Sequence, residues 1–205
     1  MQCCLASLGW LVTLLILMIS FDRRNAGGSV QQFVLSSPAF FDGEDLPRIY
    51  TADGSDLSPP LHWDGVPNNT DSFVLFFEDL GVDRDHWLHW LLFDIPADLR
   101  RLPAGIHGSP HLANGSRHGL CCGVDEGRRL GYQGPSLSTP QLSLSSGHPV
   151  SRHRFSFTLV ALDHKLSLPE GSSPLCIRQE MKGHQISAAS LTCFYGAEVV
   201  QMICS

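Results

Sequence analysis

The chain is poor in charged residues, and the charge that it carries is not basic. Charged residues make up 17% of its 205 residues, with 14 Lys and Arg against 20 Asp and Glu, so the formal net charge is −6. A chain of this sign repels a phosphate backbone and offers no basic patch to an anionic lipid surface. Nucleic acid is therefore not an expected partner. The 43% hydrophobic content instead predicts an ordered domain with a sizeable core.

Signals for catalysis or metal binding are also scarce. The sequence has no G-x-S-x-G, P-loop or paired-carboxylate motif. Its adjacent Cys121 and Cys122 do not have zinc-ribbon spacing. His86 and His89 have H-x-x-H spacing, but at a transition from loop to strand rather than on a helix. We therefore predict no catalytic residue, no metal site and no cofactor.

Charge is missing altogether from residues 5–21, an almost wholly apolar run of 17 residues. Small residues around Ala26 follow it, which predicts a secretory signal over residues 1–26 and a secreted protein. An uncleaved anchor through residues 5–21 is the alternative, because this length is at the lower limit for a bilayer span. Acceptor sequons at Asn68 and Asn114 fit a secreted glycoprotein. The five cysteines beyond the signal leave the disulfide connectivity open.

Helix signals are few, and short apolar runs bounded by Gly, Pro, Asn and Asp predict a mainly β domain over residues 30–200. Long apolar runs predict central strands buried on both faces, at residues 73–77, 88–95 and 155–162. Shorter strands are predicted at 33–35 and 61–63, a single turn at 97–99, and one helix from Ser173–Pro174 to Gly183. Two long loops are expected, a polar one at 105–131 and a Ser-rich one at 136–152 that we predict to be largely disordered.

Polar side chains mark the ends of the three predicted central strands. Asp79 follows the first, His89 opens the second and His153 opens the third. Such groups can converge on one concave site, where Asp79 would hold one imidazole by its N–H and the other imidazole would donate to a ligand. The turn at Gly134–Pro135 would let backbone N–H groups approach an anion. We expect a site for phosphate, sulfate or carboxylate.

Several motifs occur in a fixed order along the chain. They are the segments Ser36–Gly43 (SSPAFFDG), Asp53–Trp63 (DGSDLSPPLHW), His89–Trp90 with Asp94–Pro96, Gly131–Pro135 (GYQGP), His153–Phe155 (HRF), Ala161–Asp163 and Gly183–His184. This series resembles the phosphatidylethanolamine-binding protein family, in particular its bacterial and archaeal YbhB/YbcL-type branch, over about 160 residues.

The resemblance implies a β-sandwich of two sheets with a few short peripheral helices. It also implies a non-enzymatic, monomeric protein that binds a phospholipid headgroup or another anion and modulates a kinase or protease. Carried over residue by residue, the ligand-binding positions are Asp79, Trp87, His89, Gly134, Pro135, His153 and Phe155.

Three positions depart from the family pattern. Gly81 stands where the family has a second acid, Ser136 where a second Pro follows Gly-Pro, and Phe155 where a Tyr hydroxyl would donate to the ligand. Losing a donor to a bound anion costs roughly 1.5–3 kcal/mol. Two alternatives stay open: an inhibitor that acts through the surface loop 136–152, and a hydrolase that uses His89 and Asp79 as an acid–base pair.

Overall fold

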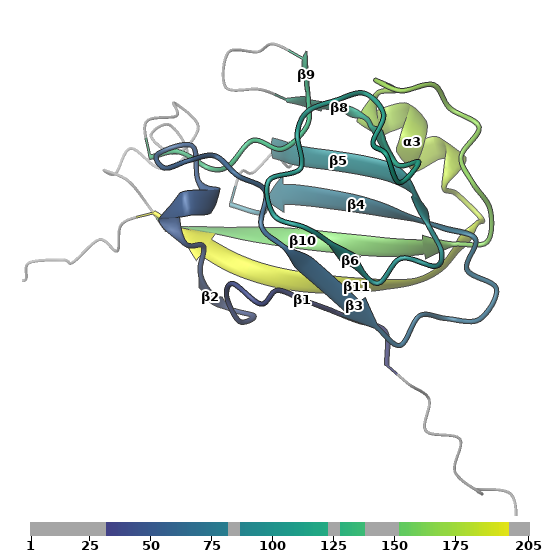
Figure 1. Cartoon of the computed structure of the whole chain (residues 1–205), viewed down its shortest axis with the longest axis horizontal. Helices are drawn as coiled ribbons and strands as arrows, with labels where there is room; N and C mark the ends of the chain where they lie inside the picture. The colour runs from purple at the N-terminus through teal and green to yellow at the C-terminus, as the bar shows by residue number, and fades with distance from the viewer. Residues whose placement is uncertain (1–31, 82–86, 123–127, 138–151, 197–205) are drawn as a thin grey trace, which may run out of the picture. The chain divides into compact units, whose positions relative to one another are not determined.

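The computed structural model describes residues 32–81, 87–122, 128–137 and 152–196 (Figure 1). The predicted signal or anchor at 1–26 and most of the Ser-rich loop lie outside the described residues. Among the residues described, no helix is long and apolar enough to cross a membrane.

The strands of the described residues form three sheets, which confirms the mainly β fold. A six-stranded sheet has the order β2 (Glu44–Asp45), β11 (Gln185–Tyr195), β10 (His153–Leu162), β4 (Ser72–Asp79), β5 (Trp87–Pro96) and β7 (Arg117–His118). A three-stranded sheet has the order β1 (Val34–Ser36), β3 (Leu61–Asp64) and β6 (Arg101–Leu102), and the two-stranded ribbon pairs β8 (Leu120–Cys122) with β9 (Arg128–Leu130). The remaining elements of the described chain are a 3-10 turn, η1 (Arg48–Tyr50), and one helix, α3 (Pro174–Glu180).

The three predicted central strands, β4, β5 and β10, lie side by side in the six-stranded sheet and are apolar because both faces are covered. One face carries Phe77 and Phe157 and packs against β1 and β3, whose side chains include Trp63. The opposite face carries Phe76 and Leu91 and is covered by α3 and β8, through residues that include Ile177. Figure 1 shows β3 across one face of this sheet and α3 beside β5 and β8.

Helix α3 forms where its boundary residues predict it. The Ser173 hydroxyl accepts the backbone N–H of Cys176, and Pro174 occupies the first turn, where no helical N–H is needed. Turns carry the chain on to Gly183, whose φ of +85° favours glycine. The predicted turn after Pro96 is also present, closed by the N–H of Leu99 bonding to the Pro96 carbonyl.

Two local predictions were wrong. The segment predicted as loop 105–131 contains β7, β8 and β9, short strands whose pairing depends on neighbours such as β5 rather than on periodicity of their own. Strand β11 was not predicted at all. Its Ser-, Thr- and Ala-rich sequence lacks the apolar run of its neighbours because much of it is exposed.

Candidate functional site

Sheet register brings the predicted site residues together at one end of the central strands. Phe155 of β10 pairs with Asp79 of β4, and Asp79 pairs with Trp87 of β5, so the three residues form one row across the sheet. His153 precedes Phe155 by two residues on β10, so the two side chains lie on the same face of the sheet. The predicted convergence of three strand ends is therefore present in the structure.

The Asp79 carboxylate holds the His153 ring. Its Oδ2 lies 2.8 Å from His153 Nδ1, and its Oδ1 accepts the backbone N–H of Gly81 at 2.7 Å. Both side chains are buried, at 4% and 3% exposure. A buried carboxylate with both oxygens satisfied fixes the ring orientation and its Nδ1–H tautomer. Thus His153, not His89, is the imidazole that Asp79 holds.

A β-bulge directs the His89 ring to the same cluster. Phe77 pairs with Trp90 and the next residue of β4 pairs with Leu88, so His89 is the extra residue. Its ring lies 5.4 Å from both the Phe77 and Phe155 rings, measured between centroids.

His89 is neutral at physiological pH. Burial lowers its pKa from 6.5 to about 4, although the hydrogen bond to Gln133 and the charge of Asp79 oppose the shift. Its Nδ1 lies 2.9 Å from the Gln133 carbonyl oxygen, which can only accept, so Nδ1 carries the proton. The remaining ring nitrogen, Nε2, therefore has a lone pair. Our expectation that this second imidazole donates to a ligand does not hold for the neutral ring.

The Gly134–Pro135 turn also differs from expectation. The Gly134 N–H donates to Asp56 Oδ1 at 2.6 Å, so it is committed within the protein rather than directed to an anion. Glycine is required because a Cβ at this position would lie 2.4 Å from the Tyr50 carbonyl oxygen. Pro135 is buried, and its carbonyl accepts the Ala52 N–H at 3.0 Å.

Two acids that we did not predict hold this turn. Asp56 accepts the Gly134 N–H, and the Asp53 carboxylate accepts from the Ser136 hydroxyl at 2.7 Å and the Leu137 N–H at 2.8 Å. It also accepts from the Tyr195 hydroxyl at 2.7 Å. Both acids belong to the D-G-x-D motif, so that motif positions the turn that ends beside His89. The motif itself was the available signal, but its partners, 78 to 142 residues away, were not visible in the sequence.

The departures from the family pattern fit this packing. A Cβ at Gly81 would lie 3.0 Å from His153 Nδ1 and 3.2 Å from Asp79 Oδ1, so a side chain there would press on the pair. Phe155 is fully buried, with its ring centroid 6.4 Å from that of His153. It contributes an apolar wall instead of a hydroxyl. Trp87 is half-buried at the start of β5.

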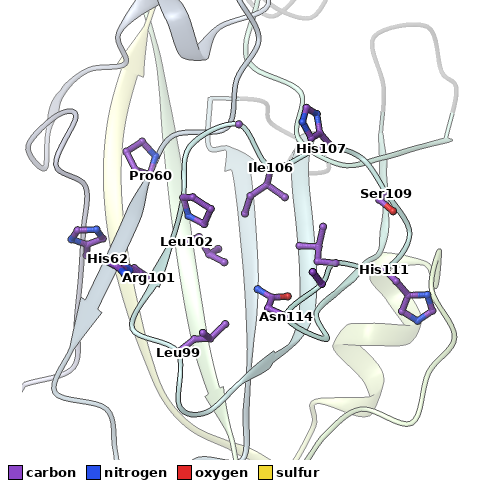
Figure 2. A pocket seen from close by; sticks show the side chains of 14 residues that line it. Pro60, His62, Leu99, Arg101, Leu102, Ile106, His107, Ser109, His111 and Asn114 are labelled. Carbon is purple, nitrogen blue, oxygen red and sulfur yellow. The ribbon is translucent and has the colours of Figure 1, made fainter.

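A separate depression of about 850 Å³ lies over β3, β6 and the segment 103–114. Figure 2 shows Leu102 and Ile106 within it, between His62 and Arg101 on one side and His107 and His111 on the other. It shares no residue with the predicted site.

Comparison with known proteins agrees with this fold. Residues 36–196 match the family model described as phosphatidylethanolamine-binding protein. The chain is 32% identical over 180 residues to a UPF0098 protein of Aquifex aeolicus, covering 87% of this chain and 96% of that protein. It is 30% identical over 161 residues to UPF0098 protein YbhB of Escherichia coli, covering 75% and 94% of the two chains.

Solved structures of two bacterial proteins have the same fold as this chain. A phosphatidylethanolamine-binding protein homologue, CT736 from Chlamydia trachomatis, superimposes with a TM-score of 0.67 at 28% identity, covering 82% of this chain and 99% of that one. YbcL of E. coli has the same fold, with a TM-score of 0.63 at 24% identity over 81% of this chain and 99% of that one. The mainly β fold and the motif series thus define a binding protein of this type. The chain belongs to the phosphatidylethanolamine-binding protein family.

Proposed function

We propose that the protein binds a phosphate-bearing ligand, without turnover, at the cluster of Asp79, His89 and His153. The observation that carries the proposal is a neutral, buried His89 beside the Asp79–His153 pair, all at the end of three rigid strands. A site on strands of a packed sheet holds its groups in place before a ligand arrives, which lowers the entropic cost of binding.

The tautomer of His89 selects the ligand. Because Nδ1–H donates to the Gln133 carbonyl, Nε2 can meet an oxyanion only if a proton lies between them. A phosphate monoester has a second pKa near 6 and can supply that proton as its own O–H, whereas sulfate has no such proton at neutral pH. The ligand we propose is therefore phosphate in its protonated, monoanionic form.

The same geometry supports binding rather than acid–base catalysis. Asp79 bonds to His153 instead of His89, so His89 lacks the carboxylate partner that the hydrolase alternative requires. A pKa of about 4 also makes His89 a weak general base at neutral pH. The surface-inhibitor alternative depends on residues 136–152, most of which lie outside the described part of the chain.

Calorimetric titration with inorganic phosphate, phosphoethanolamine and sulfate at pH 7 tests the proposal. We expect the two phosphates to bind more tightly than sulfate. The His89→Asn variant should lose about tenfold or more in phosphate affinity, as expected for one lost hydrogen bond to a charged group. Asparagine places an amide N–H near the Nδ1 position, so the bond to the Gln133 carbonyl can persist.

His107→Asn is the matched control, since His107 is exposed and lies outside the cluster. It should bind phosphate as the wild type does. The proposal fails if the wild type does not bind phosphate, or if His89→Asn binds it equally well. If phosphate and sulfate bind with equal affinity, the ligand does not supply a proton to His89 Nε2, and the cluster is a general anion site.

A further inference from the structure

A second cluster of ligating side chains lies at the other end of the central strands. Asp163 and His164 directly follow β10, and His184 directly precedes β11, which pairs antiparallel with β10. The Asp163 N–H donates to the His184 carbonyl at 3.1 Å, which joins the two segments. Ten residues of strand separate this cluster from His153, about 33 Å at the usual rise per residue. The cluster is therefore distinct from the phosphate site proposed above.

The three side chains present their ligating atoms to a common point. The atoms are one carboxylate oxygen and one nitrogen of each imidazole, and all lie within 4.8 Å of one another. Asp163 Oδ1 lies 2.9 Å from His184 Nδ1 and 3.5 Å from His164 Nδ1. In a tetrahedral zinc site with bonds of about 2.0–2.1 Å, neighbouring ligand atoms are about 3.3 Å apart. The cluster can reach that geometry with small side-chain movements.

Ordinary hydrogen bonding explains two of the three residues. His184 Nδ1 and Asp163 form a normal hydrogen bond across the connection, which also lowers the pKa of the Asp163 carboxyl. That bond alone would be a sufficient structural reason for Asp163 and His184.

His164 is the residue that this structural explanation leaves out. Its Nδ1 is buried and has no hydrogen-bond partner among the described residues, and the Asp163 oxygen at 3.5 Å is beyond ordinary hydrogen-bond length. A buried nitrogen without a partner costs free energy, and a metal ion would use its lone pair. The ring also lies against that of His184, with centroids 3.9 Å apart.

The backbone fixes these positions before any ion binds. The Ser72 hydroxyl donates to the His164 carbonyl at 2.6 Å, and the His184 N–H donates to the Met181 carbonyl at 3.1 Å. Little backbone ordering is therefore left for an ion to impose.

We propose that Asp163, His164 and His184 bind a divalent transition-metal ion of the zinc class. Two imidazoles and one carboxylate suit Zn²⁺, Ni²⁺ or Cu²⁺, whereas Mg²⁺ and Ca²⁺ prefer sets of oxygen ligands. Three protein ligands leave at least one coordination position for water. The bound ion joins the end of β10 to the start of β11, so it stabilises the folded protein in proportion to its occupancy.

Titration of the tag-free protein with Zn²⁺ by calorimetry, and with Co²⁺ by visible absorption, tests this site. The wild type should bind one equivalent, with cobalt bands in the visible range and a melting temperature that rises with Zn²⁺ concentration. His164→Asn and His184→Asn should each weaken Zn²⁺ binding more than about tenfold, which is the scale of losing a ligand or its support.

The matched control is His107→Asn, which removes an exposed histidine elsewhere and should bind Zn²⁺ as the wild type does. If His184→Asn does not fold, His164→Asn decides the question, because His164 Nδ1 has no hydrogen-bond partner among the described residues. Absence of one-equivalent binding, or equal binding by wild type and His164→Asn, would overturn the proposal. Phosphate binding measured with EDTA present should be unchanged, so failure of one site can be told from failure of the other.

Discussion

Burial of His89 makes the stability of the protein depend on pH in a defined window. The pKa of His89 is about 4 in the folded protein and about 6.5 in an unfolded chain. Below pH 6.5 the His89 ring takes up a proton in the unfolded state, whereas in the folded state it does so only below about pH 4. The unfolding free energy is therefore highest above pH 6.5 and is lost as the pH falls toward 4.

The size of this effect follows from the two pKa values. Each pKa unit corresponds to about 1.4 kcal/mol, so the whole window is worth about 3 kcal/mol, of which about 2 kcal/mol is lost between pH 7 and pH 5. Urea unfolding followed by tryptophan fluorescence at these two pH values measures it. Wild type and His107→Asn should both lose the full amount, while His89→Asn should lose about 2 kcal/mol less.

Comparison with the variant is necessary because burial also lowers the pKa of His118, which adds a loss common to all three proteins. The difference between wild type and His89→Asn isolates the His89 contribution. If His89→Asn shows the same pH dependence as the wild type, His89 does not lie neutral and buried as described, and the argument from its tautomer to the ligand fails with it.

Two further predictions concern the core and the turn. The Phe157 ring stacks on that of Phe77, with centroids 3.9 Å apart, and is fully buried, so Phe157→Ala should lower the unfolding free energy by about 3–5 kcal/mol in urea; a loss below about 1 kcal/mol would contradict this core. Gly134→Ala would set a Cβ 2.4 Å from the Tyr50 carbonyl. It should displace the adjacent Gln133 carbonyl and shift the His89 ring signals in NMR spectra, and unchanged ring signals would contradict the described contact.

The sequence by itself determined the class of fold and the location of the candidate site. Apolar runs such as residues 73–77 report burial on both faces, because a strand in the middle of a covered sheet has no solvent side. Ser173, Pro174 and Gly183 act on neighbouring backbone groups, so their meaning is local and could be read directly. The ordered motifs indicated the family. Asp79, His89 and His153 could be placed at strand ends because the apolar runs stop there.

Tertiary structure alone decided which of these groups bond to each other. Asp79 and His153 are 74 residues apart, and His89 and Gln133 are 44 apart. These pairings depend on sheet register and on a bulge that shifts one residue, neither of which leaves a local trace. The bond to Gln133 fixed the tautomer of His89, and a separate contact between residues 78 apart committed the Gly134 N–H to Asp56. The sequence therefore located the candidate site, while the long-range pairing of its strands and turn determined the hydrogen bonds of its imidazoles, on which the proposed ligand depends.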